Sequence, residues 1–108
     1  PLGRFDDLDR LTMFPDNLVP HVLRVDGVLV VDPALVRRIE AEEDIPVGSE
    51  PEVEIRAVGL HAVERLTAEL HGLGVDAPAR TLDTFLWNRG GGPTYKAVPR
   101  HRTRCVFY

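Results

Sequence analysis

A long amphipathic segment between Ser49 and Gly74 constrains the fold of this chain more than any other feature. Apolar or small residues recur there every three or four positions, and one helix face carries Ile55, Gly59, Ala62, Val63, Leu66, Leu70 and Leu73. Ser49 and Glu52 predict a capping box at the start of this helix, and two glycines predict its end near residue 73. The chain has 108 residues, so there is room for a single domain with one modest core.

Two shorter segments repeat the helical pattern. Asp32 is a typical N-cap before Pro33, and it predicts a helix that ends by Ile45 and has an apolar face of Leu35, Val36 and Ile39. A further helix is expected over residues 81–89, with inward-facing Leu82, Phe85 and Leu86. The glycines and proline at residues 90–93 predict a flexible turn, because a phosphate-binding loop would need a Lys-Ser/Thr pair and a preceding strand.

Few segments are β-like. The apolar run at residues 28–31 predicts a short strand or a buried connector, and residues 104–108 predict an extended tail. The sequence therefore predicts a mostly α fold with a packed tail.

The charge distribution limits the kinds of ligand. The net charge is −4, residues 40–54 are rich in glutamate and aspartate, and residues 89–104 carry five basic side chains and no acid. An acidic chain disfavours broad nucleic-acid binding through phosphates, whereas a local basic segment can hold a single phosphate group. We expect no direct nucleic-acid partner, but a phosphomonoester remains compatible with the sequence.

Cysteine, histidine and hydropathy patterns give three further expectations. The single Cys105 excludes an internal disulfide and indicates a reducing compartment, so we expect a cytoplasmic protein. No apolar run is long enough to cross a bilayer, so no membrane association is expected. The four histidines are not spaced as a ligand set, and we expect neither a metal nor a cofactor.

Asp16 is the candidate catalytic residue. It follows the apolar residues Met13, Phe14 and Pro15, and it precedes a helix expected over residues 18–25. A carboxylate in this position either accepts hydrogen bonds from the free N–H groups of the helix start, or has a pKa tuned for catalysis by its apolar neighbours and the helix end. The residue types leave both interpretations open.

Four segments together resemble the queuosine salvage family of queuosine 5′-phosphate N-glycosylases/hydrolases. They are residues 9–16 (DRLTMFPD) with Val19-Pro20 and Val22-Leu23, residues 48–57 (GSEPEVEIRA), residues 82–87 (LDTFLW) and residues 101–108 (HRTRCVFY). The resemblance covers nearly the whole chain, in the family's order. Family members are longer, so residues 1–108 are expected to be a single C-terminal segment of such a domain.

The resemblance implies a fold, a reaction and a catalytic residue. The fold would be similar to the C-terminal part of helix-hairpin-helix DNA glycosylases, and the reaction would hydrolyse the N-glycosidic bond of queuosine 5′-phosphate to release queuine for tRNA modification. The family's carboxylate falls on Asp16. A carboxylate can stabilise the positive charge that develops on the ribose or activate water.

The remaining candidate site residues are Phe14, Trp87, Arg102 and Arg104, all assigned to substrate binding. Trp87 either stacks on a planar base or packs in the core. Arg102 and Arg104 face one side of an extended tail, where they either contact a ribose phosphate or pair with the acids of residues 40–54.

The sequence thus predicts an enzyme acting on a small nucleotide, and the isolated segment is expected to have little activity. We also expect it to self-associate or to contact the missing N-terminal part. The alternative is a non-catalytic helical domain that binds a protein or nucleotide partner.

Overall fold

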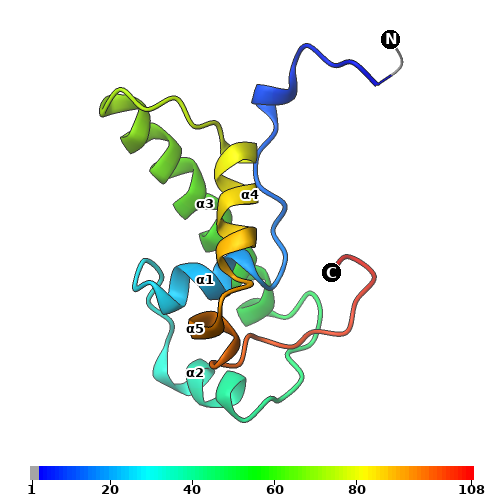
Figure 1. Ribbon diagram of the computed structural model, residues 1–108. Coiled ribbons are helices and arrows are strands. Elements are labelled where there is room, and N and C mark those ends of the chain that lie inside the picture. The colour runs from blue at the N-terminus through cyan, green and yellow to red at the C-terminus, as the bar shows by residue number, and fades with distance from the viewer. Residues whose placement is uncertain (1–2) are drawn as a thin grey trace.

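The structure is a computed structural model that describes residues 3–108, and it is built from helices (Figure 1). In chain order the elements are η1 (Leu8–Arg10), α1 (Val19–Val25), α2 (Pro33–Glu40), α3 (Glu50–Gly72), α4 (Ala79–Arg89) and α5 (Pro93–Lys96). The described residues contain no β-strand, and a single isolated parallel bridge joins Asp44 to Arg102. The predicted mostly α fold is confirmed.

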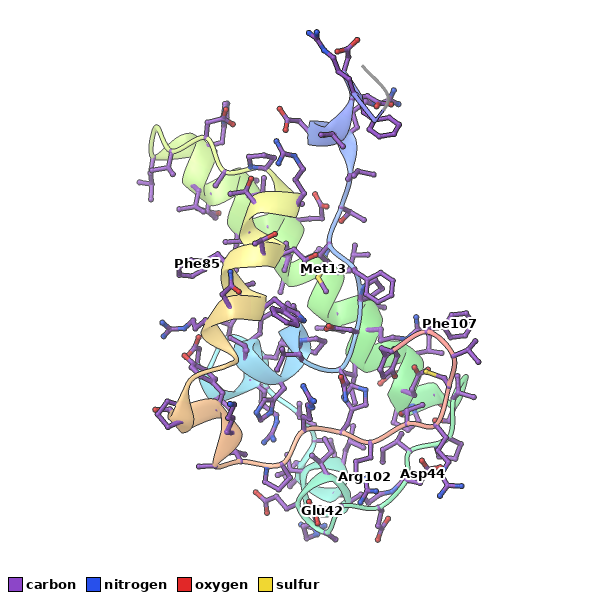
Figure 2. All side chains as sticks on the ribbon, turned by 45° about the vertical axis from the view of Figure 1, so that its right-hand side comes forward. Met13, Glu42, Asp44, Phe85, Arg102 and Phe107 are labelled. Atoms are coloured by element: carbon purple, nitrogen blue, oxygen red, sulfur yellow. The ribbon has the colours of Figure 1, made fainter. Side chains whose placement is uncertain are left out.

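The core lies where α1, α3 and α4 pack against one another. The short helix α1 contributes the fully buried Val19 and Val22, and α3 and α4 contribute Val63 and Leu86. Met13 enters this core from the segment that precedes α1 (Figure 2). Since Met13 is only three residues before Asp16, the core fixes the position of the candidate carboxylate.

The starts of α2 and α3 differ in how far they follow the sequence prediction. The Asp32 cap is confirmed, because its carboxylate accepts the Ala34 N–H at 2.8 Å. The predicted capping box does not form. The Ser49 hydroxyl donates to the Pro46 carbonyl at 2.6 Å, and Glu52 accepts the N–H of Gly48. Glu52 is therefore drawn into the interior, where it takes part in a polar network.

Helix α2 ends at Glu40, before Ile45, and Glu42 then adopts a left-handed backbone conformation with φ 56°. This turn brings Ile45 against the C-terminal tail, where its N–H donates to the Arg102 carbonyl at 2.7 Å. The tail is thereby tied to the loop between α2 and α3. The packed tail is confirmed only in part, because Val106 and Phe107 are 94% and 62% exposed.

Two apolar residues predicted to be inside are exposed. Phe85 is 58% exposed and points away from the body of the molecule (Figure 2), so its inward prediction is wrong. The buried positions of this part of the chain are Ala79, Leu86 and Gly90, and their spacing places Phe85 beyond the edge of the contact face. Val30 is 96% exposed, and residues 28–31 form neither a strand nor a fully buried connector.

The glycine run ends α4 as predicted, but Gly90 also has a packing role. A Cβ at this position would lie 2.8 Å from the Leu18 side chain and 2.9 Å from that of Val22. Because glycine has no side chain, α4 can approach α1 closely at this position. Pro93 then begins α5, which the sequence pattern did not predict.

No helix within residues 3–108 combines the length and apolar character that a bilayer crossing requires.

Candidate functional site

Asp16 lies just before α1 and is held by the start of that helix. Its Oδ1 atom accepts the N–H groups of Leu18 and Val19, both at 3.0 Å. No described residue forms a hydrogen bond with the second oxygen, Oδ2. A capping role and a chemical role for this carboxylate are therefore compatible, because they use different oxygens.

The carboxylate borders a cavity of about 240 Å³, lined by Phe14, Asp16, Asp83, Thr84 and Trp87. Phe14 and Trp87 are each 56% exposed, so both rings are available to a ligand. The interpretation of Trp87 as a core residue is wrong, because α4 turns that face away from the core. The structure brings three of the predicted site residues together around one cavity.

Asp83 is a second carboxylate in this cavity, and the sequence analysis did not select it. Its Oδ2 atom accepts the Phe14 N–H at 3.2 Å. Burial raises the pKa of Asp83, the negative charge of Asp16 raises it further, and the hydrogen bond from Phe14 opposes both effects. Its position in the sequence could have identified it, because Asp83 lies four residues before Trp87 and therefore on the same face of α4.

One of two larger cavities shares Trp87 with the Asp16 cavity, and the two larger cavities share Glu42, Arg100 and Arg102 with each other. One of about 460 Å³ includes Trp87, Lys96, Arg100 and Arg102 in its lining. The other, of about 650 Å³, includes Asn17, Arg100, Arg102 and Arg104. Trp87 thus borders both the Asp16 cavity and the 460 Å³ cavity, whereas Arg104 lines only the 650 Å³ cavity.

Arg102 and Arg104 do not pair with the acids of residues 40–54. Arg102 lies beside Glu42 and Asp44 (Figure 2), but its guanidinium donates to the backbone carbonyl of Glu42 at 3.5 Å, and neither arginine forms an ion pair within the described residues. The predicted pairing is wrong because backbone contacts, rather than carboxylates, attach the tail to this loop.

A buried polar network supports the segment that carries Asp16. The Tyr108 hydroxyl donates to Glu52 Oε1 at 2.7 Å and lies 3.2 Å from His101 Nε2. The His101 carbonyl accepts the Asn17 side-chain amide at 3.2 Å. The network thereby links the tail and the start of α3 to the residue next to Asp16.

Burial has different effects on the charges of this network. Burial would raise the pKa of Glu52, but hydrogen bonds from Tyr108, Gly48 and Arg56 hold that pKa below its usual value. Burial lowers the pKa of His101 to about 4, although the nearby Glu52 and Asp16 charges oppose this shift. Burial and the bond to Glu52 raise the pKa of Tyr108 to about 12. The sequence patterns gave no signal for His101, and they assigned Glu52 only to helix support.

His21 is a second buried histidine and lines the 460 Å³ cavity. Burial lowers its pKa, against the effect of the hydrogen bond to the Tyr95 carbonyl at 2.8 Å. The neutral ring donates from Nε2 to this carbonyl, and Nδ1 is left as an acceptor with no partner among the described residues.

No group of three histidine, cysteine, aspartate or glutamate side chains within residues 3–108 is arranged to hold a metal ion. Asp9, in the acidic N-terminal segment, instead forms an ion pair with Arg80 at 2.6 Å.

A comparison with known proteins identifies the family to which this chain belongs. The family model described as "Queuosine salvage protein" matches residues 1–108, so the chain belongs to the queuosine salvage protein family. A "Queuosine 5'-phosphate N-glycosylase/hydrolase" of Dictyostelium discoideum is 42% identical over 107 residues, which cover 99% of this chain and 33% of the relative. The Sphaerobacter thermophilus protein of the same name is 45% identical over the same shares. The Mus musculus protein of that name is 34% identical over 98% of this chain and 34% of its own.

The chain thus spans about a third of the length of these curated relatives.

Proposed function

We propose that this chain supplies the carboxylate-bearing part of an active site that hydrolyses the N-glycosidic bond of queuosine 5′-phosphate and releases queuine. One observation carries the proposal: the Asp16 carboxylate has an uncommitted oxygen in a cavity with two exposed aromatic rings. The names of the relatives give the substrate and the type of reaction.

In the proposed mechanism, the two aspartates have different roles. Breaking the bond between base and ribose leaves positive charge on the ribose ring, and the Asp16 carboxylate stabilises this charge or activates the attacking water. The departing base needs a proton. Asp83, whose pKa is raised, is the carboxyl group in this cavity suited to donate it.

The other predicted site residues position the substrate in this proposal. Phe14 and Trp87 offer ring faces on which a planar base can stack, as aromatic side chains do in many base-binding pockets. Arg102 and Arg104 contact the remainder of the nucleotide from the two larger cavities.

The direct test is Asp16→Asn in a full-length family protein that contains this segment. Asparagine keeps an oxygen that can cap α1 but removes the negative charge, so turnover should fall by about 10²–10⁴-fold with an almost unchanged melting temperature. The assay is release of free queuine from queuosine 5′-phosphate. Asp32→Asn is the matched control, because Asp32 caps α2 in a similar way and lines none of the three cavities. Retained turnover, or a parallel loss of stability, would contradict the catalytic assignment.

A second test compares the 108-residue chain with a full-length relative at equal concentration. The cavity that holds Asp16 has only five lining residues, so the chain alone should exclude water and hold the ribose poorly. We expect little queuine release from it. Equal rates would show that residues 1–108 contain the whole active site, and tight nucleotide binding without turnover by the full-length protein would favour a non-catalytic domain.

Three further expectations accompany this proposal. The arrangement of α1, α3 and α4 is expected to be part of a fold similar to helix-hairpin-helix DNA glycosylases, and a crystal structure of a full-length member would test this. The protein is expected to act in the cytoplasm, which imaging of a tagged full-length protein would test.

The exposed apolar side chains favour self-association of the isolated chain, which sedimentation at several concentrations would detect.

A further inference from the structure

We infer that Lys96 and Arg100, together with Arg102, form a binding site for a phosphate monoester in the 460 Å³ cavity next to Asp16. The inference rests on the proposed function, because it takes the 5′-phosphate of the nucleotide substrate as the ligand. It adds Lys96 of α5 and Arg100 to the site. The sequence analysis assigned neither residue individually, although it noted that the basic segment at residues 89–104 can hold one phosphate group.

The first support is an excess of positive charge. Lys96, Arg100, Arg102 and Arg104 line the two larger cavities, whereas the acids in these linings are Glu42 and Asp44. With four cations and two acids, the walls carry a formal charge of +2, in a chain with a net charge of −4. Such a concentration of one sign favours an anion at this place.

The second support is that these cations are not used by the fold. Among the described residues, Arg38, Arg56, Arg80 and Arg89 pair with carboxylates, and those pairs hold helices and loops together. Lys96 and Arg100 form no ion pair or side-chain hydrogen bond with any described residue, and Arg102 donates only to a backbone carbonyl. Their donors are therefore available for charge-assisted hydrogen bonds to phosphate oxygens.

The third support is the position of the cavity relative to Asp16. Leu18, whose N–H holds the Asp16 carboxylate, forms part of the cavity wall, and Asn17 lines the 650 Å³ cavity. Trp87 borders both the Asp16 cavity and the cationic one. A nucleotide can thus place its base and ribose beside Asp16 and Trp87 and its phosphate near Lys96 and Arg100.

A single monoester fits these observations better than a nucleic-acid backbone. Backbone binding uses many cationic contacts along an extended surface, and its affinity depends on their number. Here four cations that form no ion pair within residues 3–108 line two neighbouring cavities, and the rest of the chain is acidic.

Trp87 is the only tryptophan of the chain, so its fluorescence reports on this site specifically. The 108-residue chain is titrated with guanosine 5′-monophosphate, guanosine, ribose 5-phosphate and a ten-nucleotide single-stranded RNA. We expect guanosine 5′-monophosphate to bind at least about tenfold more tightly than guanosine, with a loss of this difference in the Lys96→Gln/Arg100→Gln variant. Ribose 5-phosphate should compete with the nucleotide.

Arg37→Gln/Arg65→Gln is the matched control, because both arginines are exposed on helices and line none of the cavities. Equal affinities for nucleotide and nucleoside, an equal effect of both double variants, or much tighter binding of the RNA would overturn the inference. Its failure is distinguishable from that of the proposed function, because the Asp16→Asn assay measures queuine release. A phosphate-dependent affinity that survives while Asp16→Asn leaves turnover unchanged would refute the catalytic role alone.

Discussion

The two ends of the molecule use polar groups in opposite ways. Where the tail crosses the start of α3, three polar side chains are almost fully buried: His21, Glu52 and His101. At the other end, the N-terminal segment lies beside α4 (Figure 1). It is attached through exposed contacts, the Asp9–Arg80 ion pair with α4 and a hydrogen bond from Thr12 to Glu64 of α3.

Exposed apolar side chains occur at both ends. Leu8, Leu11 and Leu73, at the far end, are 40%, 55% and 79% exposed, and Val106 and Phe107, in the tail, are 94% and 62% exposed. The radius of gyration is 14.9 Å, compared with about 13 Å for a compact domain of this length. The buried polar end therefore holds Asp16 in place, whereas the far end is loosely attached, and the following variants test this difference.

The largest effect is expected for Glu52→Ala. This change leaves Tyr108, Arg56 and the Gly48 N–H without their acceptor in the interior, so the free energy of unfolding should fall by about 4 kcal/mol. Urea denaturation of the chain measures it. Glu54→Ala removes an exposed carboxylate from the same helix and should change stability by less than about 0.5 kcal/mol. Similar effects of both variants would contradict the importance of the buried network.

The second expected effect is a loss of stability in acid. His101 has a folded pKa of about 4 and an unfolded pKa near 6.5, so its neutral form stabilises the fold fully above pH 6.5. As pH falls below 6.5, His101 is protonated in the unfolded chain but stays neutral in the folded chain until about pH 4. The free energy of unfolding therefore falls by on the order of 3 kcal/mol over this range. His21 contributes in the same direction, because its pKa is also lowered.

Denaturation at a series of pH values measures this slope. His101→Asn should flatten it between pH 6.5 and about 4, whereas His61→Asn, on the exposed side of α3, should leave it unchanged. The depressed pKa of Glu52 acts at lower pH, since this carboxylate stabilises the fold above its unfolded value of 4.5 and loses its effect as it is protonated. A slope that persists in His101→Asn would show that other groups cause it.

A smaller effect is expected for Gly90→Ala, at the contact between α4 and α1. The new methyl group would meet Leu18 and Val22 at less than 3.0 Å, and overpacking of this kind costs about 2 kcal/mol. Because Leu18 donates its N–H to Asp16, turnover of a full-length protein should also fall. Gly72→Ala is the control, because its methyl group would meet nothing within 4 Å. Unchanged stability of Gly90→Ala would show that the two side chains move aside.

The smallest effect is expected for Arg80→Ala, at the far end. The Asp9–Arg80 pair is short, but its side chains are 72% and 44% exposed, so solvent and salt screen it. Stability should fall by no more than about 0.5 kcal/mol, while limited proteolysis near residues 3–12 should become faster. A loss comparable to that of Glu52→Ala would remove the distinction between the two ends.

Local sequence patterns predict the helical class, the start of α2 and the extent of α3, because these follow from periodicity, from the Asp32 cap and from the glycines after α3. It also selected Asp16, Phe14 and Trp87, which lie around one cavity. The prediction of an inward-facing Phe85 failed because local periodicity does not fix which part of a helix face finds a partner.

The environments of the charged groups come from packing between distant parts of the chain. Glu52 and Arg56, four residues apart on α3, form an ion pair between close neighbours, whereas the Tyr108 contact to Glu52 joins residues 56 positions apart. The raised pKa of Asp83 likewise requires Asp16 and Phe14, which come from a distant segment. Periodicity encodes which residues share a face of one helix, whereas burial and the pKa of a carboxylate depend on the elements packed against it.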